Sequence, residues 1–161
     1  MLAGDEISKL GIVATDGATP TVQPNGIDLS LDAVWCFRAA GSLGRSNADR
    51  VLPERAELAF GDDGWVGLES GTYGIRYGEV VALPTDCGAL CFPRSSLLRM
   101  GLHVPTAVWD AGYSGRGEGL LVVGNPRGVR LQRGARIAQL VVFRLTAPTT
   151  AYAGRYQNEN R

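Results

Sequence analysis

The chain has 161 residues, of which 45% are apolar and 20% are charged. This length suits one domain, and the balance excludes a disordered chain, which would be poorer in apolar residues and more lopsided in charge. No apolar stretch approaches the roughly 18 residues of a membrane span. Acids at the start of the chain and only three cysteines favour a reduced, cytoplasmic protein without a disulfide framework.

Charge is unevenly distributed although the formal net charge is zero. Residues 1–93 hold 13 acidic and 6 basic side chains, whereas residues 94–161 hold 3 acidic and 10 basic side chains, all of them arginine. The planar guanidinium group suits phosphate oxygens, so the basic half indicates an anionic ligand. A general preference for arginine over lysine would explain the single lysine, Lys9, but not the asymmetry.

The first third of the chain contains one helical and one strand pattern. Apolar spacing predicts a short helix over Asp5–Val13. After a Pro-Asn-Gly turn, apolar and polar residues alternate over Ile27–Val34, which predicts a strand with Asp28 on its polar face. Residues 38–64 are polar and irregular, so we expect loops or hairpin connections there.

The remainder is rich in glycine and short apolar runs, which is typical of strands joined by turns. Ser95–Gly101 predicts one internal helical turn, with serine as its cap and glycine at its end. Further strands are predicted at 65–68, 72–76, 79–83, 87–92, Leu102–Val104, Thr106–Trp109, Gly119–Val123, Val129–Leu131 and Ile137–Leu145. The last is nearly all apolar, so we expect it to be buried on both faces.

About ten short strands with a single internal helix predict an all-β protein with a closed or double-layered antiparallel fold. We expect one domain over residues 1–146. The polar segment 147–161 is expected to be a flexible tail that could close over a site once something orders it.

Four segments, taken together and in chain order, resemble the motifs of the dUTPase and dCTP deaminase superfamily. They are Gly26–Leu29, Phe92–Leu97, Thr106–Gly115 and Gly134–Val141. Any one of them alone would be a weak signal, whereas the ordered set, spanning residues 24–143, is specific. The resemblance implies a distorted jelly-roll-like barrel with a short N-terminal helix, which assembles as a homotrimer with sites at subunit interfaces.

The resemblance also implies an activity, hydrolysis of dUTP to dUMP and pyrophosphate with Mg²⁺. In the third motif, Asp110 would activate the water that attacks the α-phosphate, and Tyr113 would stack under the deoxyribose and leave no room for a 2′-hydroxyl. Thr106, Ala107 and Val108 would contact the base through their backbone. From the residues alone, Asp110 is equally well explained as a turn-capping aspartate.

Phosphate contacts are implied for three residues of the second motif, Arg94, Ser95 and Ser96, and for Gln139 of the fourth. An arginine and two hydroxyls at a helix start can form a phosphate cradle, although a serine cap with a solvated arginine is the commoner explanation of such a sequence. Gln139, expected to act with Asp110 on the α-phosphate and the attacking water, could instead bond a neighbouring strand.

The resemblance gives Asp28 a part in holding Mg²⁺ through water, because Mg²⁺ keeps several of its waters. The alternative is an ordinary strand aspartate that faces solvent. In the tail, Arg155, Tyr156 and Gln157 could close over the substrate. The single histidine, His103, is expected to be structural, and no zinc pattern joins the cysteines.

The choice between two chemistries depends on one position. Deaminases of the superfamily carry a proton-shuttling glutamate in the strand after the third motif, and here Leu121 or Val122 occupies that position, with Glu118 too early. A dUTP diphosphatase therefore fits best, with dUTP and neither nucleic acid nor membrane as partner. A dCTP deaminase, a bifunctional enzyme, a triphosphatase for another base and a non-catalytic trimeric module are the alternatives.

Overall fold

The computed structural model describes all residues from 1 to 161, and its regular structure consists mostly of antiparallel strands. The helices are α1 (Gly4–Lys9), η1 (Asn47–Asp49, a 3-10 turn) and α2 (Ser95–Arg99). The strands are β1 (Val13–Ala14), β2 (Val22–Gln23), β3 (Gly26–Phe37), β4 (Arg55–Glu57), β5 (Trp65–Leu68), β6 (Gly71–Tyr77), β7 (Val80–Ala82), β8 (Cys87–Pro93), β9 (Leu102–His103), β10 (Val108–Trp109), β11 (Ser114–Gly115), β12 (Glu118–Val123), β13 (Val129–Gln132) and β14 (Arg136–Arg144). The all-β prediction is confirmed.

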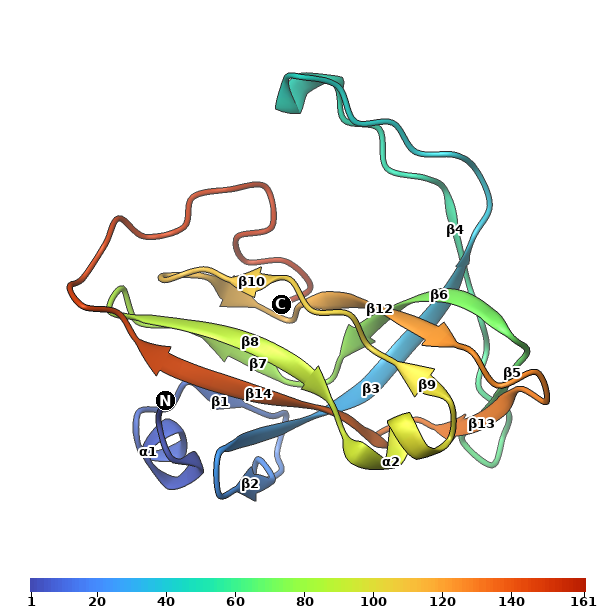
Figure 1. The fold of residues 1–161 in the computed structure, drawn as a ribbon, viewed down its shortest axis with the longest axis horizontal. Helices are drawn as coiled ribbons and strands as arrows, with labels where there is room; N and C mark the ends of the chain where they lie inside the picture. Colours follow the sequence, from blue (N-terminus) through green and yellow to red (C-terminus); the bar gives the residue numbers. More distant parts are fainter.

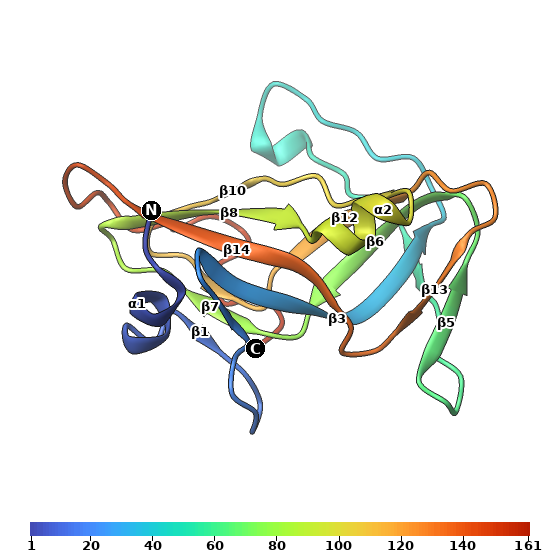
Figure 2. The same ribbon diagram turned by 60° about the horizontal axis from the view of Figure 1, so that its bottom comes forward.

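The main sheet is nine-stranded and curls around the core, with its central path in the order β10-β8-β14-β3-β6-β12-β9. Figure 2 shows β14 between β8 and β3, the arrangement that the strand register also gives. A three-stranded sheet β1-β7-β11 and the pair β13-β5 complete the fold. None of the helices is long and apolar enough to cross a membrane.

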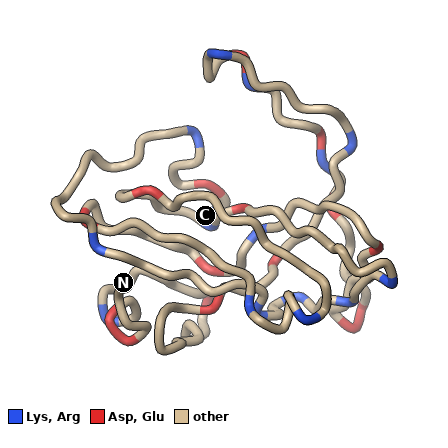
Figure 3. The backbone as a smooth tube through the Cα atoms, viewed as in Figure 1, with Lys and Arg blue, Asp and Glu red and all other residues tan.

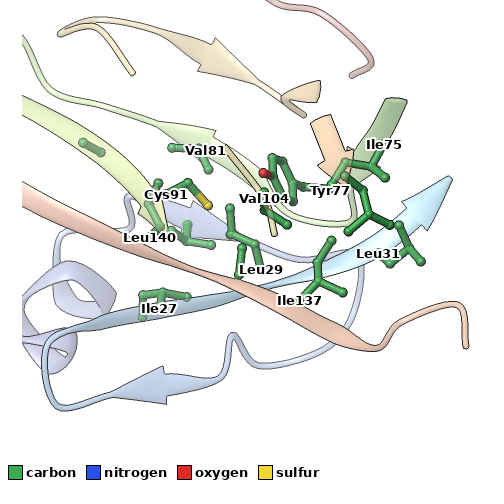
Figure 4. Close-up of a cluster of buried hydrophobic side chains, with 14 of the residues drawn as sticks. Ile27, Leu29, Leu31, Ile75, Tyr77, Val81, Cys91, Val104, Ile137 and Leu140 are labelled. Atoms are coloured by element: carbon green, nitrogen blue, oxygen red, sulfur yellow. The ribbon is translucent and has the colours of Figure 1, made fainter. Parts of the chain in front are cut away.

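The core lies inside the curl of this sheet. Alternate residues of β3, namely Ile27, Leu29 and Leu31, are fully buried, as the period-two pattern predicts. They pack with side chains of β6, β8 and β14 in a single apolar cluster (Figure 4). Burial of this surface is the main stabilising contribution to the fold.

The N-terminal helix and β14 differ from the pattern-based expectation. The N-terminal helix ends at Lys9, because Gly11 takes a positive φ of 65° and turns the chain into β1. β14 buries one face only, since alternate residues on its other face are half-exposed. The connection between β3 and β4 is irregular, as expected, and projects from the body as a long arm carrying η1 (Figure 1).

Tight contact between β3 and β14 generates a stability prediction. A Cβ added at Gly26 would lie 2.3 Å from the Leu140 carbonyl oxygen and 3.1 Å from the Gln139 side chain. Because backbone cannot move aside cheaply, Gly26→Ala should destabilise the protein by roughly 1–3 kcal/mol in urea unfolding. Gly67→Ala is the matched control, because nothing lies within 4 Å of its added Cβ. Equal stability of the two variants would contradict the close approach.

Candidate active site

Asp28 is the buried centre of a positively charged cluster whose arginines reach solvent. Asp28 is only 2% exposed and is covered by polar side chains, so it lies on the polar face of β3 as predicted, whereas the alternative of a solvent-facing aspartate is wrong. Gln23 Nε2 donates to Asp28 Oδ2 at 2.8 Å, while Arg94 Nε and Arg136 Nη1 each lie 3.5 Å from the same oxygen. Asp28 Oδ1 is buried and has no hydrogen-bond partner.

Strand register explains why these residues meet. Gln139 of β14 lies opposite Asp28 on one side and Phe92 on the other, so three of the four motifs become neighbours across β3, β14 and β8. Arg94 follows β8, and its backbone N–H donates to the Ile137 carbonyl at 3.1 Å. We call Asp28, Arg94, Arg136 and Gln139 the basic cluster. Figure 3 shows further basic positions around α2, next to the basic cluster.

The start of α2 differs from the predicted serine cap. Arg94, not Ser95, is the N-cap residue, and no side chain caps the helix. Ser95 and Ser96 are exposed at the first turn, beside Arg94. Their hydroxyls are therefore free to bind a ligand, as a phosphate cradle requires.

A separate pocket of about 320 Å³ lies under the C-terminal tail. We call it the tail pocket, and it is lined by Ala107, Val108, Trp109, Asp110, Tyr113, Gly117, Glu118, Tyr152, Tyr156 and Glu159. Two of the three predicted base-contacting residues are among them. The third, Thr106, fixes this segment because its Oγ1 accepts from the Cys91 N–H at 2.9 Å and donates to the Ala107 carbonyl at 2.9 Å.

Asp110 is exposed at the edge of the tail pocket, on a turn that directs the chain back into the body. Tyr113 N–H donates to the Asp110 carbonyl at 3.1 Å, and Gly112 supplies the positive φ of 78° that such a turn needs at its third position. A capping aspartate would bond the N–H of Gly112, but that N–H donates to Leu83 O at 3.1 Å. The geometry therefore disfavours the capping alternative.

Tyr113 is buried at the pocket floor between aromatic neighbours. Its ring meets Trp109 edge to face at 5.3 Å and Tyr152 at 6.0 Å between centroids. The hydroxyl donates to Glu159 Oε1 at 2.9 Å. Burial, followed by the hydrogen bond to Glu159, raises the pKa of Tyr113 well above its ordinary value, so the hydroxyl stays a donor at physiological pH.

The tail packs against its own chain, and its turns form backbone hydrogen bonds with the edge of β11. Asn158 N–H donates to Ser114 O at 2.7 Å, and Arg116 N–H donates to Glu159 O at 2.9 Å. The Gln157 side chain bonds the backbone of this edge at two points and does not line the pocket. Tyr156 lines it and accepts from Arg50 Nη1 at 3.4 Å, while Arg155 is exposed.

The position that would hold a deaminase glutamate carries no acid. Leu121 is fully buried and faces the core, and Val122 pairs with Thr72 of β6 on one side and His103 of β9 on the other. Glu118 does line the tail pocket, where it is paired with Arg55 at 2.8 Å. This is a different place on β12, roughly 13 Å from Val122 at about 3.3 Å per strand residue.

The basic cluster and the tail pocket are separated within one chain. β10 runs antiparallel to β8 with Trp109 opposite Ala89, so Asp110 extends towards Gly88. Arg94 lies six residues further along β8, about 20 Å away at roughly 3.3 Å per residue. The predicted site residues thus form two groups, with Asp28, Arg94 and Gln139 in one and Asp110 and Tyr113 in the other.

Sequence reasoning missed several members of both groups. Arg136 lies inside the fourth motif, and its charge beside Gln139 was an available signal. Gln23 and Tyr152 carried no signal, because only folding brings them to Asp28 and Tyr113. Glu159 is the only acid of the tail and could have been singled out on that ground.

Comparison with known proteins agrees with this architecture. The dCTP deaminase-like family matches residues 3–145. A probable deoxyuridine 5′-triphosphate nucleotidohydrolase of Archaeoglobus fulgidus is 46% identical, over 99% of this chain and 97% of its own. Its counterpart in Aeropyrum pernix is 45% identical over 98% of each chain.

Solved structures of the same fold include a 2′-deoxycytidine 5′-triphosphate deaminase from Agrobacterium tumefaciens. That protein has a TM-score of 0.64 and 25% identity over 88% of this chain, which spans about half of the deaminase, 46% of its length. The native dUTPase of EIAV has a TM-score of 0.54 and 16% identity over 92% of this chain and 98% of its own. The ordered motifs, the curled sheet and the match over most of its length place the chain in the dCTP deaminase-like family.

Proposed function

We propose that the protein is a dUTP diphosphatase that hydrolyses dUTP to dUMP and pyrophosphate. The observation that carries the proposal is Asp110, an exposed carboxylate at the edge of a pocket whose floor is the buried Tyr113. The names of the archaeal relatives support the same substrate. The absence of an acid at Leu121 and Val122 favours hydrolysis over deamination.

The chemistry follows from these groups. Asp110 orients a water and accepts its proton as the water oxygen bonds to the α-phosphorus, and the bond from that phosphorus to the bridging oxygen breaks to release pyrophosphate. Gln139 bonds the α-phosphate and the same water. Arg94, Arg136 and the hydroxyls of Ser95 and Ser96 bind the remaining phosphate oxygens.

Mg²⁺ fits the basic cluster as a partner of the substrate. No group of three or more acidic, histidine or cysteine side chains could hold a metal ion by itself. However, the buried and unpartnered Asp28 Oδ1 can accept from a water of an ion bound mainly by phosphates. When bound, the ion would neutralise phosphate charge. One fold neighbour, a phage dUTPase, is described with a structural Mg(II) ion.

We also propose a homotrimer whose sites lie between subunits. Arg94 of the basic cluster and Asp110 lie about 20 Å apart within one chain by the strand spacing of roughly 3.3 Å per residue. They could act on one triphosphate if one subunit supplied Asp110 and its neighbour supplied Arg94. We place the enzyme in the cytoplasm, where its three unpaired thiols would stay reduced.

Product analysis tests the reaction directly. With Mg²⁺ and either dUTP or dCTP, we expect pyrophosphate and dUMP from dUTP and no ammonia from dCTP. Ammonia from dCTP would assign the protein to the deaminase chemistry and make Glu118 the first carboxylate to replace. No product in either reaction would instead favour a non-catalytic module.

Asp110→Asn tests the proposed base. The variant keeps the turn, because Tyr113 bonds the backbone carbonyl of Asp110 and not its side chain. We therefore expect unchanged thermal stability and dUTP binding, with kcat lowered roughly 10²–10⁴-fold. Asp62→Asn, an exposed aspartate in the loop before β5, is the control. Retained hydrolysis in Asp110→Asn would disprove the role.

Subunit mixing tests the shared site. Asp110→Asn and Arg94→Ala should each be inactive as pure proteins. After co-refolding of the two in equal amounts, about a quarter of the sites in random trimers would combine an intact Asp110 with an intact Arg94 from the neighbour. Activity should therefore reappear. A mixture that forms trimers and stays inactive would show that each site uses a single subunit.

A further inference from the structure

The tail supplies the only side-chain hydrogen bond that the Tyr113 hydroxyl makes. Glu159 Oε1 accepts from that hydroxyl at 2.9 Å, and the glutamate is itself partly buried in the tail pocket. A hydrogen bond to a carboxylate is shorter and stronger than one between neutral groups. The orientation of the Tyr113 ring therefore depends on a residue 46 positions later in the chain.

Gln157 holds the backbone on both sides of the same tyrosine. Its Oε1 accepts from Ser114 N–H at 2.8 Å, and its Nε2 donates to the Gly112 carbonyl at 2.8 Å. The Gln157 amide thus accepts one hydrogen bond from the residue after Tyr113 and donates one to the residue before it. The adjacent backbone bond from Asn158 N–H to Ser114 O at 2.7 Å keeps it in place.

The contacts of the Tyr113 ring restrict its sideways movement more than its movement along the axis of the hydroxyl. Trp109 and Tyr152 meet it edge to face, which limits sideways movement. Movement along the axis of the hydroxyl is opposed by the hydrogen bond to Glu159 and by the tail backbone at the same residue. A Cβ at Gly115 would lie 2.8 Å from this hydroxyl and 3.0 Å from Glu159 O, so the tail is packed directly against it.

We propose that Glu159 and Gln157 are positioning residues that hold Tyr113 in place and thereby determine how strongly the site rejects a 2′-hydroxyl. The inference rests on the proposed function, in which Tyr113 stacks under the deoxyribose. A ring that can retreat leaves space for one more oxygen, whereas a ring fixed at both its backbone and its hydroxyl does not. Glu159 acts through Tyr113 and does not touch the reacting atoms.

The experiment measures discrimination, the ratio of kcat/KM for dUTP to kcat/KM for UTP, in the full-length enzyme. Tyr113→Ala provides the reference for a lost sugar contact. Glu159→Ala should lower the ratio roughly tenfold, by admitting UTP and not by losing kcat for dUTP. Glu159→Gln keeps an oxygen acceptor and should retain most of the ratio. Glu57→Ala, an exposed glutamate of β4, is the matched control.

A double-mutant cycle separates this role from direct substrate contact. Tyr113→Phe removes the hydroxyl and keeps the ring, so Glu159→Ala should have no further effect on the ratio in that background. Gln157→Ala should lower the ratio in either background, because it acts on the backbone.

Two results would overturn the inference. One is an unchanged ratio in Glu159→Ala, and the other is an effect of Glu159→Ala that is equally large with Phe at position 113. If the proposed function itself were wrong, the unmodified protein would not hydrolyse dUTP, and this result is distinct from both of those above.

Discussion

The arrangement of the site depends on one constraint, the close antiparallel pairing of β14 with β3 on one side and β8 on the other. Gly26 permits this approach where β3 begins, because a side chain there would collide with the backbone of β14. The same pairing sets Gln139 opposite Asp28 and brings Arg94 to the end of the neighbouring strand. Strand pairing alone therefore brings together three motifs that lie far apart in the chain, and no bound ligand is needed to assemble the cluster.

Burial of Asp28 changes what that cluster can do. A carboxylate removed from water is costly unless it is paired, and here Gln23, Arg94 and Arg136 all approach a single oxygen. The other oxygen stays without a partner. Asp28 Oδ2 thus holds two guanidinium groups close together, while Oδ1 remains free to accept a hydrogen bond. This arrangement suits an anionic ligand that binds together with a hydrated cation.

The tail pocket follows a different principle, since it is assembled from the edge of a short strand and the end of the chain. β11 pairs with β7 on one side, and the tail satisfies its other edge through backbone bonds. Because the pocket includes Tyr152, Tyr156 and Glu159, its shape depends on tail docking. Because this pocket and the basic cluster are separated within one chain, the proposed activity requires the proposed trimer, in which two subunits contribute to one site.

Much of the fold could be predicted from local pattern. Alternation over Ile27–Val34, the short strands between glycines and the helical turn after Arg94 are all present, because burial of one strand face and turn chemistry act over a few neighbouring residues. The order of the four motifs likewise identified the family, and it is the source of the proposal that Asp110, Tyr113, Arg94 and Gln139 belong to the site. Fold class and family are therefore properties that the sequence by itself determined.

Only the tertiary structure decided the burial of Asp28, the participation of Arg136 and Gln23, and the docking of Gln157 and Glu159 around Tyr113. Each of these depends on contacts between residues distant in sequence, and strand alternation places a residue on a face without saying what covers that face. The polar pattern of β3 thus left a solvent-facing Asp28 open as an alternative, whereas the residues that cover it come from β2, β14 and the start of α2. Long-range pairing, and not local propensity, set the chemistry of both groups.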